Sequence, residues 1–537
     1  MKKKLLDCPT ILHNTTRCGL LCFLLAGITF LACSSTQLLA EPMPASRNTE
    51  GQGFPRFVVS FPEEVHLEPV TARVLLFFSR TAGREPRYSS PYVDIQPVYA
   101  IDVNNLRPGQ KVVFSPEKFQ APDALAFPGP LSRLEAGTWY VQALFDIDKI
   151  DPDYNAEGNL YSRVSQFELT SRGREEVELI ADQVIQRRPP RRDTERVKLV
   201  EIRSNFLSDF HGREVKFRAG VVLPSTYNER PDQQFPVLYI IPGFGGDHTS
   251  AWWMANEDGG DMIQVVLDPK VPLGHSVFAN SANNGPVGDA LVQELIPEIE
   301  KRFRAITHAY GRLVTGHSSG GWASLWLQVA YPDFFGGCWS MAPDPVDFTH
   351  FQTMNIYKDL NGHWTDEGYP RPLARAGGEV IATFGDVDRR EYVVGYGGQL
   401  DSFNAVFSPR GKNGEPLPVM DKLTGIIDPE VAEYWKRYDI KLVLENNWPT
   451  LGPKLKGKLH IVAGGWDTYY LALAVASLRD FLVTTDYGGY VEILPGDHGS
   501  FRTQQFEQRI NSEMAEYFKA GQKAYKETHS ISDTIEP

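Results

Sequence analysis

The chain has 537 residues, of which 42% are hydrophobic and 23% charged, with a formal net charge of −13 at pH 7. This length and balance are typical of a folded protein with several domains and exclude a disordered chain. The negative charge disfavours nucleic acid as a partner, so we expect no nucleic-acid binding. After the N-terminal leader, no stretch is long and apolar enough to span a bilayer. We therefore expect no integral membrane domain in the mature chain.

Residues 1–40 have the features of a signal peptide. Four basic residues precede an apolar run over residues 18–33. This run has the length of a signal h-region and is short for a membrane span. Cleavage after Ala40 predicts an exported protein, periplasmic or extracellular. Cleavage before Cys33 predicts a lipoprotein instead, and an uncleaved anchor is the third alternative. Residues 41–53 are polar and predict a disordered lead-in.

The cysteines predict no disulfide framework and no zinc site. Four of the five lie in the leader, which leaves Cys338 alone in the mature chain. We expect no metal and no cofactor.

Residues 54–186 carry short strand patterns separated by turns. Val, Phe and Tyr are frequent, and no helix-period segment stands out. This spacing predicts a smaller all-β domain that resembles a sandwich. Residues 187–194 are charged, contain two adjacent prolines and predict a linker. The expected strands are 56–61, 73–79, 97–103, 112–115, 139–145 and 165–170.

From residue 195 to residue 522, apolar strands alternate with helical patterns. This alternation predicts an α/β domain with a mostly parallel sheet, covered by helices on both faces. Residues 523–537 form a polar tail. The expected strands are 196–206, 213–223, 235–241, 276–280, 313–315, 337–342, 458–463 and 490–494, and the expected helices are 287–304, 321–330, 469–483 and 504–519.

Residues 348–457 interrupt the alternation. They are rich in Gly, Pro, Asp and aromatic residues, with one helical pattern near residues 429–438. The segment lies between two expected sheet strands, and loops at the ends of such strands build active sites. We expect an inserted cap that shapes the substrate pocket.

The pentapeptide G-H-S-S-G at residues 316–320 predicts a nucleophilic serine, Ser318. A serine between a strand and a helix, with a small residue two positions away on either side, is raised above the sheet by a tight turn. An apolar strand precedes this pentapeptide and a helical pattern follows it. Ser319 fits the pattern less well, and a turn without chemistry is the other interpretation.

A serine hydroxyl needs a base, and the base needs an acid to orient it. His498 follows the last expected strand and is the best base, with a solvated loop histidine as the alternative. Asp467 follows the strand at 458–463 and is the best acid, although an aspartate here also fits a helix N-cap. The chain order of serine, acid and histidine is the one expected for this class.

The sequence P-G-F-G-G at residues 242–246 ends a buried strand and predicts the oxyanion hole. We expect the backbone N–H groups of Phe244 and Ser319 to donate to the developing oxyanion. A tight glycine turn without this role is the alternative.

With these motifs in place, roughly residues 196–520 resemble the esterase-D-type putative esterases, whose relatives include feruloyl esterases, enterobactin esterases and mycolyltransferases. The resemblance implies an α/β-hydrolase fold and carboxylic-ester chemistry without a cofactor. It carries the nucleophile onto Ser318, the acid onto Asp467 and the base onto His498. Pro242 departs from the family pattern, since many members have histidine there.

The leading expectation is a secreted serine hydrolase that cleaves a small-molecule or glycan-linked carboxylic ester through an acyl-serine intermediate. An acyltransferase with the same triad and a catalytically inert binding protein with the hydrolase fold are the alternatives.

Overall fold

The computed structural model describes residues 55–170, 176–187, 189, 191–256 and 259–532. The expected signal peptide and the lead-in at residues 41–53 lie outside these residues. Residues 52–537 form one compact unit. Within the described residues, no helix has the length and apolar character that a membrane crossing needs.

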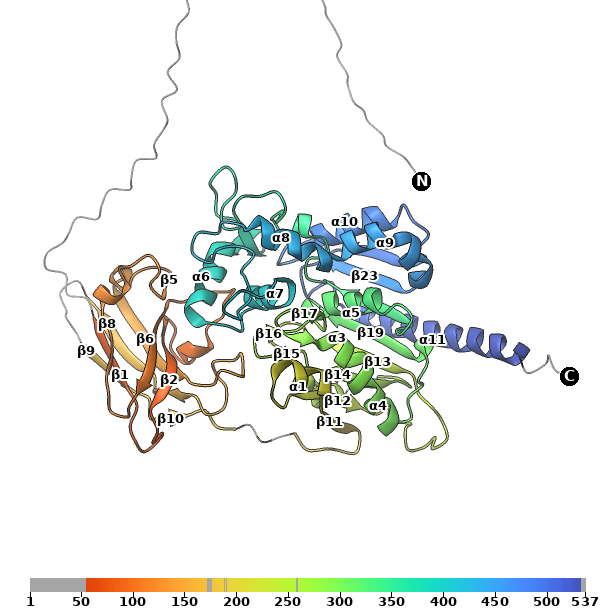
Figure 1. Ribbon diagram of the computed structural model, residues 1–537, viewed down its shortest axis with the longest axis horizontal. Helices are drawn as coiled ribbons and strands as arrows, with labels where there is room; N and C mark the ends of the chain where they lie inside the picture. Colours follow the sequence, from red (N-terminus) through yellow and green to blue (C-terminus); the bar gives the residue numbers. More distant parts are fainter. Residues whose placement is uncertain (1–54, 171–175, 188, 190, 257–258, 533–537) are drawn as a thin grey trace, which may run out of the picture. The chain divides into compact units, whose positions relative to one another are not determined.

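The first ten strands form two sheets, drawn in red to yellow in Figure 1. The smaller sheet has the order β4-β1-β9, and the larger has the order β10-β7-β6-β2-β3-β5 with β8 paired to β6. The six expected strands are therefore present, whereas a separate β domain stays a prediction because residues 52–537 form one unit. The strands are β1 (Arg56–Ser60), β2 (Val70–Ser79), β3 (Val98–Leu106), β4 (Val112–Phe114), β5 (Ala126–Phe127), β6 (Gly137–Asp146), β7 (Leu160–Tyr161), β8 (Ser165–Leu169), β9 (Glu176–Ile180) and β10 (Gln183–Val184).

The larger of these sheets is buried on both faces. Alternate residues of β2 contribute to a core between the two sheets, as the period of a strand requires. The residues between them, Leu75 and Phe77, share a second core with Val393 at the end of α6 (Phe384–Val394). Arg73 donates hydrogen bonds to the last backbone carbonyls of this helix, at 3.1 and 3.2 Å. The β strands are thus packed against the segment that was expected to be a cap.

The rest of the chain is built on an eight-stranded sheet with the order β11-β12-β14-β13-β19-β20-β23-β24. Pairing is antiparallel between β11, β12 and β14 and parallel from β14 to β24. This confirms the mostly parallel sheet, and the strand order with its serine turn after β19 is the α/β-hydrolase arrangement. The strands are β11 (Val197–Arg203), β12 (Lys216–Val222), β13 (Val237–Ile241), β14 (Ile263–Leu267), β19 (Arg312–His317), β20 (Gly337–Met341), β23 (Leu459–Gly464) and β24 (Tyr490–Leu494).

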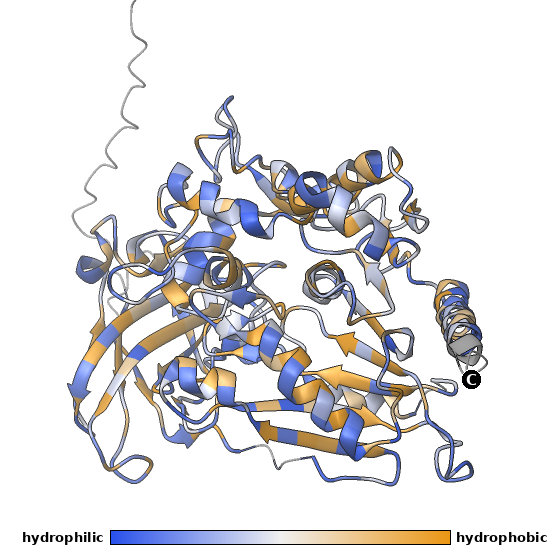
Figure 2. Ribbon diagram, turned by 45° about the vertical axis from the view of Figure 1, so that its right-hand side comes forward, coloured by the Kyte–Doolittle hydropathy of each residue, from blue (hydrophilic) through white to orange (hydrophobic). Residues whose placement is uncertain are grey.

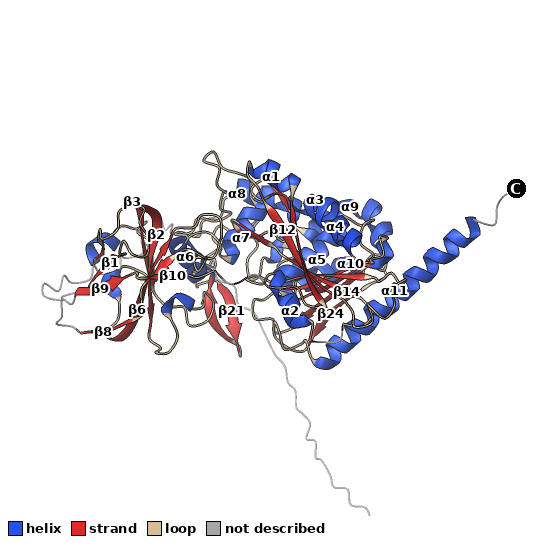
Figure 3. Cartoon of the chain, turned by 90° about the horizontal axis from the view of Figure 1, so that it is seen from below, coloured by secondary structure: helices blue, strands red, loops and turns tan. Residues whose placement is uncertain are grey.

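Helices cover both faces of this sheet, and Figure 2 shows its strands in hydrophobic colours. On β13, Tyr239 belongs to the core that includes α5, whereas the next residue back, Leu238, belongs to the core with α11. The helices outside the insertion are α1 (Asn205–His211), α2 (Ala251–Met254), α3 (Val287–Ala290), α4 (Ile296–Arg302), α5 (Ser319–Ala330), α10 (Ala472–Leu482) and α11 (Gln504–Ser532). In Figures 1 and 3, α11 extends past the edge of the sheet.

Three local expectations differ from the structure. The strand expected at 276–280 is wrong, because Val277 and Phe278 have positive φ angles of 43° and 52° and the chain turns there. The strand β14, in the middle of the sheet, was not expected. The helix expected at 287–304 contains a π-helical turn at Leu291–Leu295. Short hairpins follow β14, formed by β15 (Lys270–Val271) with β16 (Gly274–His275) and by β17 (Asn280–Ser281) with β18 (Gly285–Pro286).

The segment between β20 and β23 is a compact insertion. Its buried aromatic residues, such as Phe407 and Trp435, belong to the same core as Trp322 of α5. The insertion is therefore continuous with the main core. It comprises β21 (Pro372–Ala376), β22 (Glu379–Thr383), α6, α7 (Gln399–Phe407), α8 (Pro429–Trp435) and α9 (Ile440–Leu455).

Candidate active site

Ser318 occupies the sharp turn between β19 and α5. Its φ of 61° and ψ of −125° lie outside the regions that L-residues favour. Such strain persists only where the surroundings enforce it, and here the Ser318 N–H donates to the carbonyl of Met341 on β20 at 3.0 Å. The turn is the one that the pentapeptide predicted.

The two glycines of the pentapeptide are required by close backbone contacts. A Cβ atom at Gly316 would lie 2.1 Å from the Gly320 carbonyl oxygen, and one at Gly320 would lie 2.0 Å from the Ile241 carbonyl oxygen. Both distances are far below van der Waals contact, so any side chain here would open the turn. The motif thus needs glycine at both positions because the backbone of the turn and of α5 lies so close to itself and to β13.

The two neighbouring serines have different surroundings. Ser319 is 1% exposed, and its hydroxyl donates to Oδ2 of Asp344 at 2.5 Å. Ser318 is only half-buried, and within the described residues its hydroxyl makes no hydrogen bond. Of the two, Ser318 alone presents a hydroxyl that a substrate can reach.

His498 and Asp467 are brought together by the loops after β24 and β23. Nδ1 of the imidazole lies 2.8 Å from Oδ2 of Asp467, whose side chain is fully buried. The other carboxylate oxygen accepts the backbone N–H of Tyr469 at 2.8 Å. One oxygen of Asp467 thus caps the turn that follows it, and the other contacts the imidazole. The N-cap and the acid, which were the two interpretations of Asp467, are therefore compatible.

The rival acids are engaged elsewhere. Asp344 holds Ser319, Asp347 accepts from Ser477 at 2.5 Å, and Asp497 accepts the backbone N–H groups of the two residues after His498. Among the described residues, Asp467 is the carboxylate that contacts the His498 imidazole.

The Ser318 hydroxyl and the His498 imidazole are not joined by a hydrogen bond in this structure. Catalytic hydrogen bonds often tighten only when substrate binds. The ring of His498 lies against that of His317, with centroids 4.4 Å apart, and His317 directly precedes the serine. His498 thus lies beside the elbow without contacting the Ser318 hydroxyl.

His317 holds the loop that carries His498. Burial, reinforced by the neighbouring His498, lowers the pKa of His317 to about 4, so its ring is neutral at pH 7. Its Nε2 lies 2.7 Å from the backbone carbonyl of His498, and this geometry requires Nε2 to carry the proton and donate.

The loop after β13, which the sequence predicts to form the oxyanion hole, lies against the elbow. A Cβ atom at Gly243 would lie 3.1 Å from the His317 carbonyl oxygen and 3.4 Å from the Cβ of Ser318. The N–H groups of Phe244 and Ser319 donate to no other group in the described part of the chain. The predicted donors are therefore unused and lie on the two segments that meet at Ser318.

A buried histidine contacts this loop at Pro242, the residue that departs from the family pattern. Nε2 of His275 lies 3.1 Å from the Pro242 carbonyl oxygen, while Nδ1 accepts the N–H of Val277. Burial lowers the pKa of His275 to about 4, so Nε2–H is the donor to Pro242.

A hydrogen-bond network connects the elbow to distant parts of the chain. The Gln399 amide at the start of α7 donates to Ser319 Oγ at 3.3 Å and lies 3.4 Å from Asp344 Oδ2. Its carbonyl oxygen accepts the hydroxyl of Tyr92, which precedes β3. Burial raises the pKa of Asp344 to about 6, against the opposing effect of its hydrogen bond from Ser319.

These supporting residues could hardly be predicted from the sequence. His275, Tyr92 and Gln399 stand in no motif, and each reaches the site through tertiary contacts. His317 had a usable signal because it lies inside the pentapeptide. Within the described residues, no group of three or more His, Cys, Asp or Glu side chains is arranged to hold a metal ion.

Comparison with known proteins gives partial matches. A stretch of 133 residues is 29% identical to the endo-1,4-β-xylanase/feruloyl esterase of Xylanibacter ruminicola, covering 22% of this chain and 18% of that protein. The chain thus spans about a fifth of this curated relative. Among solved structures, the fluorophosphonate-binding serine hydrolase FphF of Staphylococcus aureus is 16% identical with a TM-score of 0.33, covering 60% of this chain and 98% of that one. An S-formylglutathione hydrolase from Agrobacterium tumefaciens is 12% identical with a TM-score of 0.35, covering 60% and 94%.

Residues 210–439 match the family model described as "Putative esterase". The matched range contains Ser318 and the glycine-rich loop at residues 242–246, and it ends before Asp467 and His498. The match supports the expected class, a carboxylic ester hydrolase. Residues 210–439, a little under half of the chain, are thus similar to the putative esterase family.

Proposed function

We propose that the chain is an exported serine esterase that hydrolyses a carboxylic ester through an acyl-Ser318 intermediate. The observation that carries this proposal is the 2.8 Å contact between His498 and the fully buried Asp467, beside a serine held at positive φ. A buried carboxylate that orients a histidine next to a strained, reachable serine is the arrangement that nucleophilic catalysis needs.

The proposed reaction has two halves. In the first, His498 takes the proton of the Ser318 hydroxyl as the oxygen attacks the ester carbonyl carbon, and the backbone N–H groups of Phe244 and Ser319 stabilise the resulting oxyanion. The intermediate collapses, the C–O bond to the alcohol breaks, and His498 returns the proton to the departing alcohol. In the second half, water attacks the acyl-serine with the same base and releases the acid.

The acceptor in the second half separates an esterase from an acyltransferase. With 4-nitrophenyl acetate as substrate, an esterase forms acetate at the same rate as 4-nitrophenol, even when methanol or glucose is added. An acyltransferase instead transfers the acetyl group to the added acceptor. A folded protein that releases no nitrophenol above the rate of the Ser318→Ala variant would be a binding protein, and the proposal would be wrong.

Export rests on the sequence of residues 1–40, with cleavage after Ala40 or, in a lipoprotein, before Cys33. Intact mass measurement of the protein from its native host distinguishes these sites, since a lipid on Cys33 adds mass to a chain that begins there. The ester is proposed to be a small molecule or attached to a glycan.

A further inference from the structure

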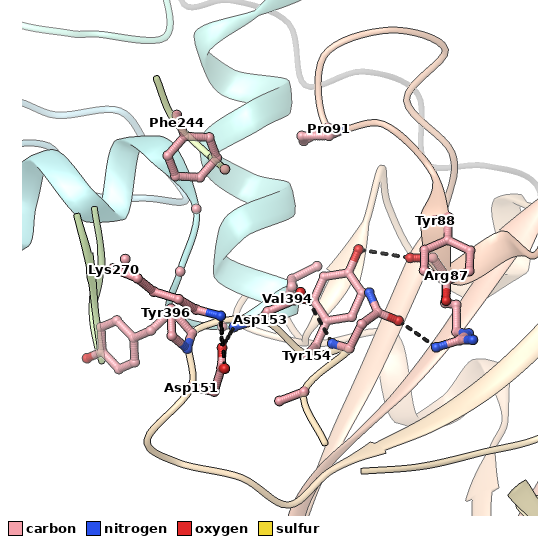
Figure 4. Close-up of a pocket in the computed structure, with 18 of the residues that line it drawn as sticks. Arg87, Tyr88, Pro91, Asp151, Asp153, Tyr154, Phe244, Lys270, Val394 and Tyr396 are labelled. Carbon is pink, nitrogen blue, oxygen red and sulfur yellow. Dashed lines mark hydrogen bonds and ion pairs between the residues drawn. The ribbon is translucent and has the colours of Figure 1, made fainter. Parts of the chain in front are cut away.

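A cavity of about 810 Å³ lies next to the oxyanion loop. Its lining includes four stretches that are distant in sequence. They are residues around Arg87–Tyr92, residues Asp151–Glu157, the loop at Phe244–Asp247, and the end of α6 with the residues after it. In Figure 4, the lining residues Tyr154 and Val394 lie near the middle of the view, and Phe244 and Pro91 lie near its top. This volume is of the size that holds a small-molecule ligand.

Two lining residues connect the cavity to the reaction centre. Phe244 supplies one of the proposed oxyanion donors. Tyr92 packs its ring against Tyr469 with centroids 5.9 Å apart, and Tyr469 in turn packs against His498 with centroids 4.9 Å apart. The cavity thus borders residues that surround Ser318 and His498, although neither of these two residues lines it.

Arg390 of α6 lines the cavity and is only 3% exposed. Its neighbours are hydroxyl groups: one terminal nitrogen donates to Ser89 Oγ at 3.2 Å, and the Tyr154 hydroxyl lies within its reach. Its Nε atom is buried without any hydrogen-bond partner in the described residues. No carboxylate within the described part of the chain lies within ion-pair distance of this guanidinium.

The other cations that line the cavity have carboxylate partners. Arg87 pairs with Glu85 at 2.6 Å, and Lys270 pairs with Asp151 at 2.7 Å, as Figure 4 shows for the second pair. Arg187, at the rim, lies 3.7 Å from a glutamate oxygen. Among the described residues that line the cavity, Arg390 is thus the cation left without a counter-charge.

A buried guanidinium without a counter-charge is costly, and such a group is retained where a ligand supplies the missing partner. The planar guanidinium forms two parallel hydrogen bonds with a carboxylate, and Nε is one of the donors in the side-on form of this pair. The planar, charged guanidinium of Arg390 therefore matches a carboxylate ligand in shape and in charge.

We infer that the cavity binds a carboxylate on the part of the ester substrate remote from the scissile bond, and that Arg390 is its anchor. This rests on the proposed esterase function and adds the substrate class, an ester that also carries a free carboxylate. Arg390 is a specificity residue and takes no part in the bond-breaking steps.

The test compares an acid with its neutral primary amide in two substrate pairs. Mono(4-nitrophenyl) suberate and its amide place the group on the acyl side, whereas 3-(4-acetoxyphenyl)propionate and its amide place it on the alcohol side. We expect wild-type kcat/KM to favour the acid by about tenfold or more in one pair, through KM, as charge-assisted hydrogen bonds predict. The Arg390→Met variant should bring that acid-to-amide ratio to about one.

Arg389→Met is the matched control, since the neighbouring Arg389 donates to the Pro128 carbonyl and does not line the cavity. It should keep the acid-to-amide ratio of the wild type. The inference is overturned if wild type shows no preference for the acid in either pair, or if the preference survives Arg390→Met.

A binding measurement separates this inference from the proposed function. Free suberate should raise the melting temperature of the Ser318→Ala protein, and suberic diamide should not. If no ester is hydrolysed but suberate still stabilises in an Arg390-dependent way, the proposed function fails and the carboxylate site stands. If neutral esters are hydrolysed, neither pair favours the acid and suberate has no effect, the carboxylate site is wrong. If Arg390→Met fails to fold, the absence of a melting shift in the protein with intact Arg390 still overturns the carboxylate site.

Discussion

The hydroxyl of Tyr92 donates a hydrogen bond of 3.0 Å to Oε1 of Gln399. Tyr92 lies in the loop before β3, and Gln399 begins α7 of the insertion. Since the Gln399 amide reaches Ser319 and Asp344, this bond links the N-terminal strands, the insertion and the residue after the nucleophile. The candidate site is thus completed by two segments outside the core of the sheet.

Removal of this hydroxyl should weaken catalysis. Tyr92→Phe keeps the ring against Tyr469 and leaves the Gln399 oxygen without its donor, which costs about 1–2 kcal/mol of stability. We expect kcat to fall by roughly three- to tenfold with little change in KM, because the Ser319 N–H loses part of its support. Tyr140→Phe, whose hydroxyl makes no hydrogen bond among the described residues, should leave both parameters unchanged. An equal effect of the two variants would contradict the link.

Replacement of the proposed acid should impair the base without disturbing the fold. Asp467→Asn keeps the acceptor for the Tyr469 N–H but cannot hold the correct His498 tautomer, so kcat should fall by about 10⁴-fold. Asp497→Asn, next to His498 in sequence but exposed, should change kcat by less than about threefold. Steady-state kinetics with 4-nitrophenyl acetate measures both. A larger loss in the Asp497 variant would identify the wrong acid.

Asp344 should give stability a dependence on pH. Because burial raises its folded pKa to about 6, from 3.8, its stabilising contribution is complete below about pH 4 and is lost as the pH rises through 6. The loss amounts to about 3 kcal/mol. An amide at this position does not titrate. We therefore expect Asp344→Asn to become more stable relative to wild type, by about this amount, between pH 4 and pH 7.5.

Urea unfolding of both proteins at the two pH values measures this change, and other titrating groups cancel in the comparison. Asp497→Asn is a control of opposite sign, because backbone N–H groups lower the pKa of Asp497 and its contribution is lost as the pH falls. A stability difference between Asp344→Asn and wild type that is independent of pH would show that the carboxyl titrates normally.

Much of the fold was predictable where the residues carry a local pattern. The strand β24 lies at the predicted residues 490–494, and the G-H-S-S-G turn joins a strand to a helix as predicted. The strand β14 was missed because its five residues follow a polar, glycine-rich stretch. The helix α9 was missed because it contains Pro449 and Pro453, which local propensity excludes and tertiary packing tolerates.

The residues of the site also fall into those that a local pattern predicts and those that it does not. Ser318, Asp467 and His498 follow strand ends, so their positions in a parallel sheet bring them to one edge whatever the loops do. Tyr92 and Gln399 come together through the packing of α6 on the larger N-terminal sheet. No local pattern in the sequence predicts this packing.

The most direct test of the account is the identity of the nucleophile. We expect a fluorophosphonate probe to modify the wild-type protein once, and mass spectrometry of the digested adduct to place the probe on Ser318. The adduct should be absent from Ser318→Ala and should persist in Ser319→Ala. An adduct on Ser319, or folded wild-type protein that takes up no probe, would contradict the central claim.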